Sequence, residues 1–138
     1  MNLNNFTIKA QEAVQKAQEI AGGLQQQAIE NAHLLKALLS VDENVVGYLL
    51  KKLNINISRL TTGVDDLIAT YPKVSGSNIY LSNSANATLQ KAQAYLKDFK
   101  DEFVSLEHIL LALLAGADKN AALLKDQGAN EKDLKKAI

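Results

Sequence analysis

The stretch HLLKALL at residues 33–39 recurs as HILLALL at residues 108–114, and the only two histidines of the chain open the two copies. The repetition extends beyond this heptapeptide. When the sequence is aligned with itself at an offset of 75 residues, QKAQ at 15–18 also falls on QKAQ at 90–93. Self-similarity of this length indicates two copies of one supersecondary unit that stack on each other.

Each copy is predicted to form four helices. The apolar spacing, the capping Ser, Thr and Asn residues, and the stops at Gly and Pro set their limits. The N-caps include Thr7 and Ser105, and Gly22–Gly23 is expected to stop the first helix. The expected helices cover about 8–22, 31–40, 44–53 and 58–70, then, after a connector at 71–81, 82 or 84 to 98, 106–115, 120–127 and 130 onward.

The two heptapeptides also predict how the copies are arranged. Nearly every position in them is apolar, so each helix must be buried around most of its circumference. Neither four-helix unit could cover such a helix alone. We therefore predict an all-α fold, a pseudo-twofold duplication of a four-helix unit with about eight helices, in a single compact domain with these two helices at its centre. No segment alternates convincingly as a strand.

The composition excludes several classes of function. Fifteen basic and fifteen acidic residues give a formal net charge of zero, and Arg59 is the sole arginine, so nucleic-acid binding is not expected. The absence of cysteine excludes disulfides and thiolate metal sites. The polar N-terminus lacks the features of a signal peptide, and no apolar run is long enough to span a membrane. These features predict no membrane partner and a cytoplasmic location.

The sequence contains no residue pattern that is typical of a catalytic site. The segment GSNIYLSN lacks the spacing of a phosphate-binding loop, and no nucleophile motif or metal-ligand spacing is present. We predict that this polypeptide is not an enzyme and has no catalytic residues, metal or cofactor of its own.

With Ser105 as the N-cap, His108 lies at the third helical position. Both histidines are interpreted as structural residues that close hydrogen bonds at a helix start, although the sequence leaves their role open.

The repeated segments AIENAHLLKALL and FVSLEHILLALL resemble the Clp N-terminal domain of ring-forming AAA+ unfoldases. The opening NNFTIKAQEAVQKAQ and the connector YPKVSGSNIYLS resemble its ClpB branch of protein disaggregases. This resemblance covers essentially the whole chain. It implies one domain over 1–138, with the first repeat at about 5–70 and the second at about 82–138.

The resemblance implies a mobile domain on a homohexameric ring that captures exposed apolar segments of unfolded or aggregated proteins. It implies ATP and Mg²⁺ in AAA+ domains that lie outside this sequence, and a monomer for the isolated domain. The substrate-binding positions that it implies are Thr7, Leu89, Asp101, Glu107 and His108. Leu89 and His108 occupy positions that form an apolar groove wall in some relatives, and substitution of Leu89 or Glu107 is expected to weaken binding without unfolding.

A second interpretation is a docking domain for a folded adaptor protein, as in the protease-linked ClpA and ClpC relatives. The ClpC branch has Glu directly before the histidine in both copies, and this pair serves recognition of phosphorylated arginine. Here Glu107 occupies that position in the second copy, but Ala32 occupies it in the first. The broken pair argues against a phosphoarginine role.

Overall fold

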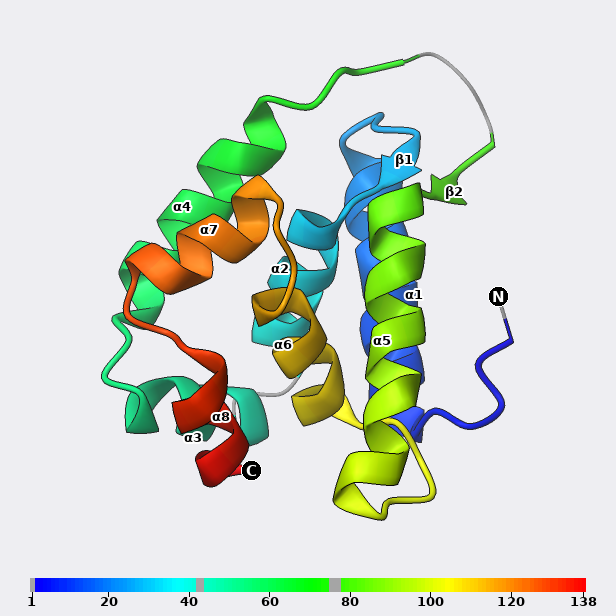
Figure 1. The fold of residues 1–138 in the computed structure, drawn as a ribbon. Coiled ribbons are helices and arrows are strands. Elements are labelled where there is room, and N and C mark those ends of the chain that lie inside the picture. The colour runs from blue at the N-terminus through cyan, green and yellow to red at the C-terminus, as the bar shows by residue number, and fades with distance from the viewer. Residues whose placement is uncertain (1, 42–43, 75–77) are drawn as a thin grey trace.

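The computed structural model describes residues 2–41, 44–74 and 78–138, and most of these residues lie in helices (Figure 1). The helices of the first copy are α1 (Ile8–Gly23), α2 (Asn31–Val41), α3 (Val45–Lys52) and α4 (Ile57–Ala69). Those of the second copy are α5 (Asn83–Phe99), α6 (Leu106–Leu114), α7 (Lys119–Asp126) and α8 (Glu131–Ala137). The predicted all-α class with about eight helices is confirmed, and each predicted helix limit agrees within one residue.

Side-chain caps account for where the helices begin. The hydroxyl of Thr7 accepts the backbone N–H of Ala10 at 3.1 Å at the start of α1. The hydroxyl of Ser82 accepts the N–H of Ala85 at 3.0 Å at the start of α5, the equivalent place in the second copy. These bonds satisfy amide groups that have no partner within the helix. The prediction of Thr7 as an N-cap is confirmed.

The predicted stop of α1 at Gly22–Gly23 is wrong in its mechanism. The helix continues through both glycines, and the left-handed residue that ends it is Gln25, with φ of 59°. Gly22 serves a different purpose, because a Cβ there would lie 2.8 Å from Cδ1 of Ile79. The glycine lets the segment before α5 pass close to the end of α1.

Helices α2 and α6 lie at the centre of the domain, as the heptapeptides predict. Every residue of α6 except Glu107 is buried, and α2 is buried over most of its length. The two helices pack against each other, while α1 and α4 cover α2, and α5 and α7 cover α6 (Figure 1). None of the described helices is long and apolar enough to cross a membrane.

The sequence does not predict the small parallel sheet of β1 (Ala28–Ile29) and β2 (Tyr80–Leu81). Strand β2 lies at the end of the predicted connector, of which residues 75–77 fall outside the described residues. Each strand has two residues, which is too short to show the alternation that identifies a strand in a sequence. The repeat limits at about 5–70 and 82–138 stay predictions.

This sheet is one half of a reciprocal backbone pairing between the copies. Leu81 lies opposite Ile29 in the sheet, and Phe6 forms a parallel bridge with Val104. At the offset of 75 residues these are the same pair with the copies exchanged. In each case the segment that enters the first helix of one copy pairs with the segment before the second helix of the other copy. The pairing therefore fixes the register of one copy on the other.

Helices α4 and α7 approach each other closely at Gly63. A Cβ at this position would lie 2.7 Å from Cδ1 of Leu123. Gly47, in α3, is used for comparison because it is also a helix-interior glycine, yet a Cβ there would meet no atom within 4 Å.

We expect Gly63→Val to lower the free energy of unfolding by about 1–3 kcal/mol relative to Gly47→Val, because added side-chain volume must displace Leu123. Chemical denaturation measures the difference. The loss should shrink when Gly63→Val is made together with Leu123→Ala, which removes the obstructing methyl groups. Equal losses for the two valine variants would contradict the close packing of α4 on α7.

Candidate functional site

An apolar groove of about 370 Å³ lies where the N-terminal ends of α1, α3 and α6 meet. The described residues that line it are Thr7, Ile8, Lys9, Val45, Ser105, Leu106 and Glu107. The Phe6–Val104 bridge brings the two sides together, since the backbone N–H of Thr7 donates to the carbonyl of Val104 at 2.8 Å. The groove is thus built at a contact between the copies.

Two exposed aliphatic side chains give the groove its character. Ile8 is 77% exposed and Val45 is 38% exposed. Ile8 points away from the face of α1 that is buried in the core, which is made of Ala10, Ala13, Ala17 and Ala21. An isoleucine on the outer face of an amphipathic helix gains no burial from the fold, so its apolar surface remains available to a partner.

The structure brings two of the predicted site residues together. Thr7 and Glu107 both line the apolar groove, one at the start of α1 and the other in the first turn of α6. The carboxylate of Glu107 lies at a helix N-terminus, where the helix dipole favours negative charge. Ile8 and Val45 also line the groove but were not among the predicted site residues. The sequence did hold a signal for Ile8, because this apolar residue lies off the alanine face of α1.

Leu89 and His108 do not lie at the groove surface, which corrects the prediction that they form its wall. Leu89 is completely buried in the face of α5 that packs on α6, together with Ala85 and Ala92. His108 is 1% exposed. Substitution of Leu89 would therefore leave a cavity in the core, and we expect it to lower stability in addition to any effect on binding.

Both buried histidines bond to the backbone just before their own helix. Nδ1 of His33 accepts the backbone N–H of Glu30 at 2.9 Å, before α2. Nδ1 of His108 accepts the backbone N–H of Ser105 at 2.9 Å, before α6. Each ring takes the place of the glutamate or glutamine in an ordinary capping box. The structural interpretation of the histidines is confirmed.

The second nitrogen of each ring reaches back seven residues. Since Nδ1 accepts a backbone N–H, the neutral ring carries its proton on Nε2 and donates from there. His33 Nε2 lies 2.7 Å from Oε1 of Gln26, and His108 Nε2 lies 2.9 Å from Oδ2 of Asp101. We call this arrangement, in which one ring joins the helix start to the preceding loop, the histidine clamp.

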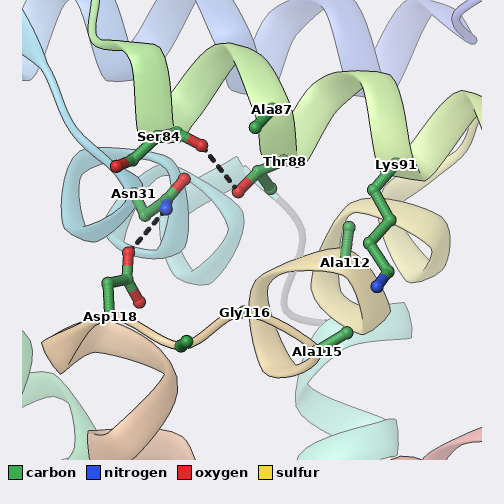
Figure 2. Close-up of a pocket in the computed structure, with 10 residues that line it drawn as sticks. Asn31, Ser84, Ala87, Thr88, Lys91, Ala112, Ala115, Gly116 and Asp118 are labelled. Carbon is green, nitrogen blue, oxygen red and sulfur yellow. Dashed lines mark hydrogen bonds between the residues drawn. The ribbon is translucent and has the colours of Figure 1, made fainter.

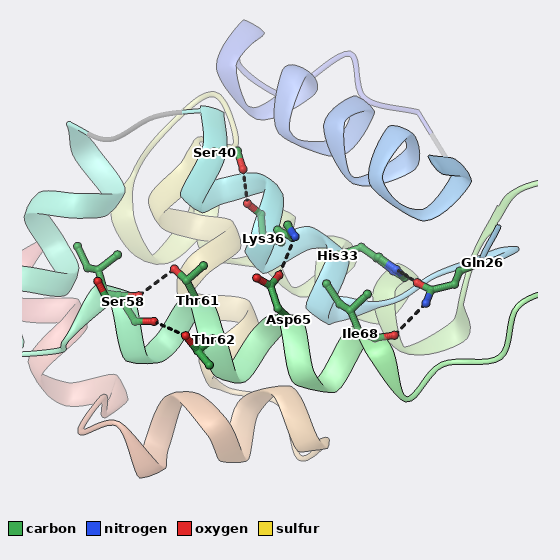
Figure 3. Close-up of polar contacts among 10 residues, drawn as sticks. Gln26, His33, Lys36, Ser40, Ser58, Thr61, Thr62, Asp65 and Ile68 are labelled. Atoms are coloured by element: carbon green, nitrogen blue, oxygen red, sulfur yellow. Dashed lines mark hydrogen bonds and ion pairs between the residues drawn. The ribbon is translucent and has the colours of Figure 1, made fainter. Parts of the chain in front are cut away.

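The clamp of the first copy is buried, and its surroundings keep the ring neutral. Gln26 continues the clamp by donating from Nε2 to the carbonyl of Ile68 at 2.8 Å, at the end of α4 (Figure 3). Burial lowers the pKa of His33 to about 4, and the positive charge of Lys36 contributes to the shift. Lys36 itself pairs with Asp65 of α4 at 2.6 Å (Figure 3).

The clamp of the second copy includes Asp101, which was predicted to bind substrate. Its carboxylate is 47% exposed and accepts the Nε2–H of His108. Asp101 does not line the groove directly. It holds the loop between α5 and α6, and this loop carries Val104, which pairs with the segment before α1. The geometry makes Asp101 a positioning residue for the groove.

Among the described residues, no group of three or more His, Asp or Glu side chains is arranged to hold a metal ion. The histidine nitrogens that such an ion would need are occupied by the clamps.

Comparison with known proteins decides the family. The family model described as Clp repeat (R) N-terminal domain matches residues 5–127. The chain belongs to this family. The chain is 51% identical over 138 residues to the Chaperone protein ClpB of Bacteroides thetaiotaomicron and 46% identical over 138 residues to that of Porphyromonas gingivalis. All of this chain is covered in both comparisons, but it spans 16% of the length of each relative.

Solved structures share the fold of this Clp N-terminal domain. The Hsp104 N-terminal domain from Candida albicans matches with a TM-score of 0.84 at 24% identity, over 96% of this chain and 88% of that one. A ClpV N-domain solved in complex with a VipB peptide matches with a TM-score of 0.78 at 20% identity, over 99% of this chain and 88% of that one. At these identities the comparisons establish the fold alone.

The histidine clamp predicts a pH dependence of stability. Between pH 6.5 and about 4 the unfolded chain binds a proton at residue 33 that the folded chain does not. Stability must therefore fall as the pH falls through this window, and the full shift corresponds to about 3 kcal/mol. The variant His33→Asn keeps an acceptor for the backbone but has no titrating group. We expect denaturation curves across this range to show a smaller pH dependence for the variant.

The comparison of slopes is the control, because His33→Asn also loses the bond to Gln26 and is expected to be less stable at every pH. Identical pH slopes for the two proteins would show that His33 titrates normally in the folded chain.

Proposed function

We propose that this domain captures exposed apolar segments of unfolded or aggregated proteins for a ClpB-type chaperone. The observation that carries the proposal is the apolar groove, in which exposed Ile8 and Val45 stand beside the polar groups of Thr7 and Glu107. An unfolded client offers the matching surfaces, since its aliphatic side chains are exposed together with main-chain N–H and C=O groups.

The shape and chemistry of the groove favour weak, sequence-tolerant binding. Its volume of about 370 Å³ accommodates a few side chains and not a folded surface. Apolar contact supplies binding energy without a directional preference, while the hydroxyl of Thr7 and the carboxylate of Glu107 can bond the main chain of any sequence. Such a site suits a chaperone that must accept many clients.

The relatives support the same proposal. The two curated relatives cited above are named ClpB chaperones, and the ClpV N-domain shows that a domain of this fold can hold a peptide. Neither comparison names the groove residues of this chain. The assignment of Ile8 and Val45 to client contact rests on the geometry of the groove, and that of Thr7 and Glu107 rests on the geometry together with the family resemblance.

The proposal extends to the longer protein that the relatives represent. There the domain would hand its clients to an AAA+ ring. This ring would be a homohexamer in the cytoplasm, and its ATPase domains would bind ATP and Mg²⁺. The present sequence has no phosphate-binding loop, so these cofactors would act outside it. The isolated domain would be a monomer without catalytic activity.

A matched pair of valines tests the groove. Val45 lines it and is 38% exposed, whereas Val74, after α4, is outside it and is 43% exposed. We expect Val45→Ser to weaken binding of a reduced, carboxymethylated protein that cannot refold by about fivefold, because apolar contact is lost. Fluorescence anisotropy of the labelled client measures the change.

Val74→Ser is the control and should bind as the unmodified domain does. Circular dichroism must show that both variants stay folded. Equal affinity of the two variants would reject the groove as the client site, and tighter binding of a folded protein than of an unfolded one would favour adaptor docking.

A further inference from the structure

The apolar groove has a counterpart of opposite character in the other half of the molecule. At the offset of 75 residues, Leu106 at the start of α6 corresponds to Asn31 at the start of α2, and Lys9 of α1 corresponds to Ser84 of α5. The third helix of the second copy, α7, begins after its N-cap Asp118. We call the surface formed by Asn31, Ser84, Asp118 and Asn120 the polar seam.

Two adjoining pockets lie on the polar seam. Their volumes are about 430 and 300 Å³, and both are lined by Asn31, Ser84 and Asp118. Figure 2 shows these side chains converging from α2, α5 and the start of α7. The charged side chains around the two pockets are Lys91 and Lys119 on one hand and Glu30 and Asp118 on the other, so they balance. This balance favours an uncharged ligand.

Asn31 presents a buried acceptor to the pockets. Its Nδ2 donates to Oδ2 of Asp118 at 2.6 Å, and because a carboxylate only accepts, this bond fixes which end of the amide is the oxygen. Asn31 is 6% exposed, and its Oδ1 has no hydrogen-bond partner among the described residues. Figure 2 shows this oxygen turned from Asp118 toward α5.

Asn120 adds a donor and a second acceptor. It is 2% exposed and lines the smaller pocket together with Asn31. Within the described part of the chain, neither Oδ1 nor Nδ2 of Asn120 has a hydrogen-bond partner. Buried polar atoms without partners are rare in folded proteins, and a site that contains three of them on two side chains is short of a ligand that both donates and accepts.

A polypeptide main chain meets these requirements. In an extended segment, the N–H and C=O of one residue point to the same side, so they can pair with the oxygen and nitrogen of one asparagine side chain. The next N–H on that side lies two residues further along, where Asn31 Oδ1 could accept it. A carboxylate or a phosphate would supply only acceptors, and an ammonium only donors.

We propose that the polar seam binds the main chain of an extended, uncharged polar segment of another protein, through the amides of Asn31 and Asn120. This site is separate from the apolar groove and does not depend on client capture there. It would give the domain a second contact for the polar stretches that lie between the apolar segments of an unfolded chain.

The test uses a capped, uncharged hexapeptide of alternating glycine and serine, titrated into the domain while amide NMR spectra are recorded. We expect shifts of the side-chain NH₂ signals of Asn31 and Asn120 and of the backbone signals of Ser84 and Asp118. The same peptide with every peptide nitrogen methylated lacks the N–H donors and should not bind. This comparison needs no variant, so it decides the matter even if a buried substitution prevents folding.

The variant Asn120→Leu removes the amide and keeps a side chain of similar size. It should weaken binding of the hexapeptide by about tenfold, since two hydrogen bonds are lost. Asn4→Leu, the same change at an exposed position outside the seam, should have no effect. No shifts with the hexapeptide, equal binding of its methylated form, or unchanged affinity of Asn120→Leu would overturn the proposal and leave water as the occupant of the seam.

Discussion

The whole structure depends on the burial of two helices that a single four-helix unit cannot cover. In α6 every residue except Glu107 is buried, and α2 is nearly as apolar. Each of them packs against helices from both copies, so we expect that one copy does not fold without the other. The reciprocal backbone pairs Phe6–Val104 and Leu81–Ile29 then set the register of the two copies. The surface features described above are all located by this arrangement.

Much of the fold could be predicted because short stretches of sequence determine where the helices begin and end and which of them are buried. Helix limits follow from caps such as Thr7 and Ser82, and the central position of α2 and α6 follows from their uniform apolarity. The two-residue strands could not be predicted, because they are held by a partner segment distant in the sequence. Gly22 was interpreted as a helix stop for a similar reason. The lack of a side chain at Gly22 leaves room for Ile79, and this contact exists only in the folded chain.

The candidate site was predictable only in part. The motif resemblance led to Thr7 and Glu107, which line the groove, but it also led to Leu89 and His108, which are buried. A motif marks positions near a site without stating which way each side chain points.

The histidine clamps show what the repeated histidine does: it joins a loop to the start of a central helix and thereby places the residues that form the groove. The clamp is present in both copies, whereas the adjoining surfaces differ: one is the apolar groove and the other is the polar seam.

Binding of unfolded polypeptide in the apolar groove is the function proposed for this domain. The most direct measurement is an amide NMR titration with a permanently unfolded protein and, separately, with its folded counterpart. We expect shifts for Thr7, Ile8, Val45 and Glu107 with the unfolded form alone. Shifts confined to another face, or equal responses to the folded form, would contradict it.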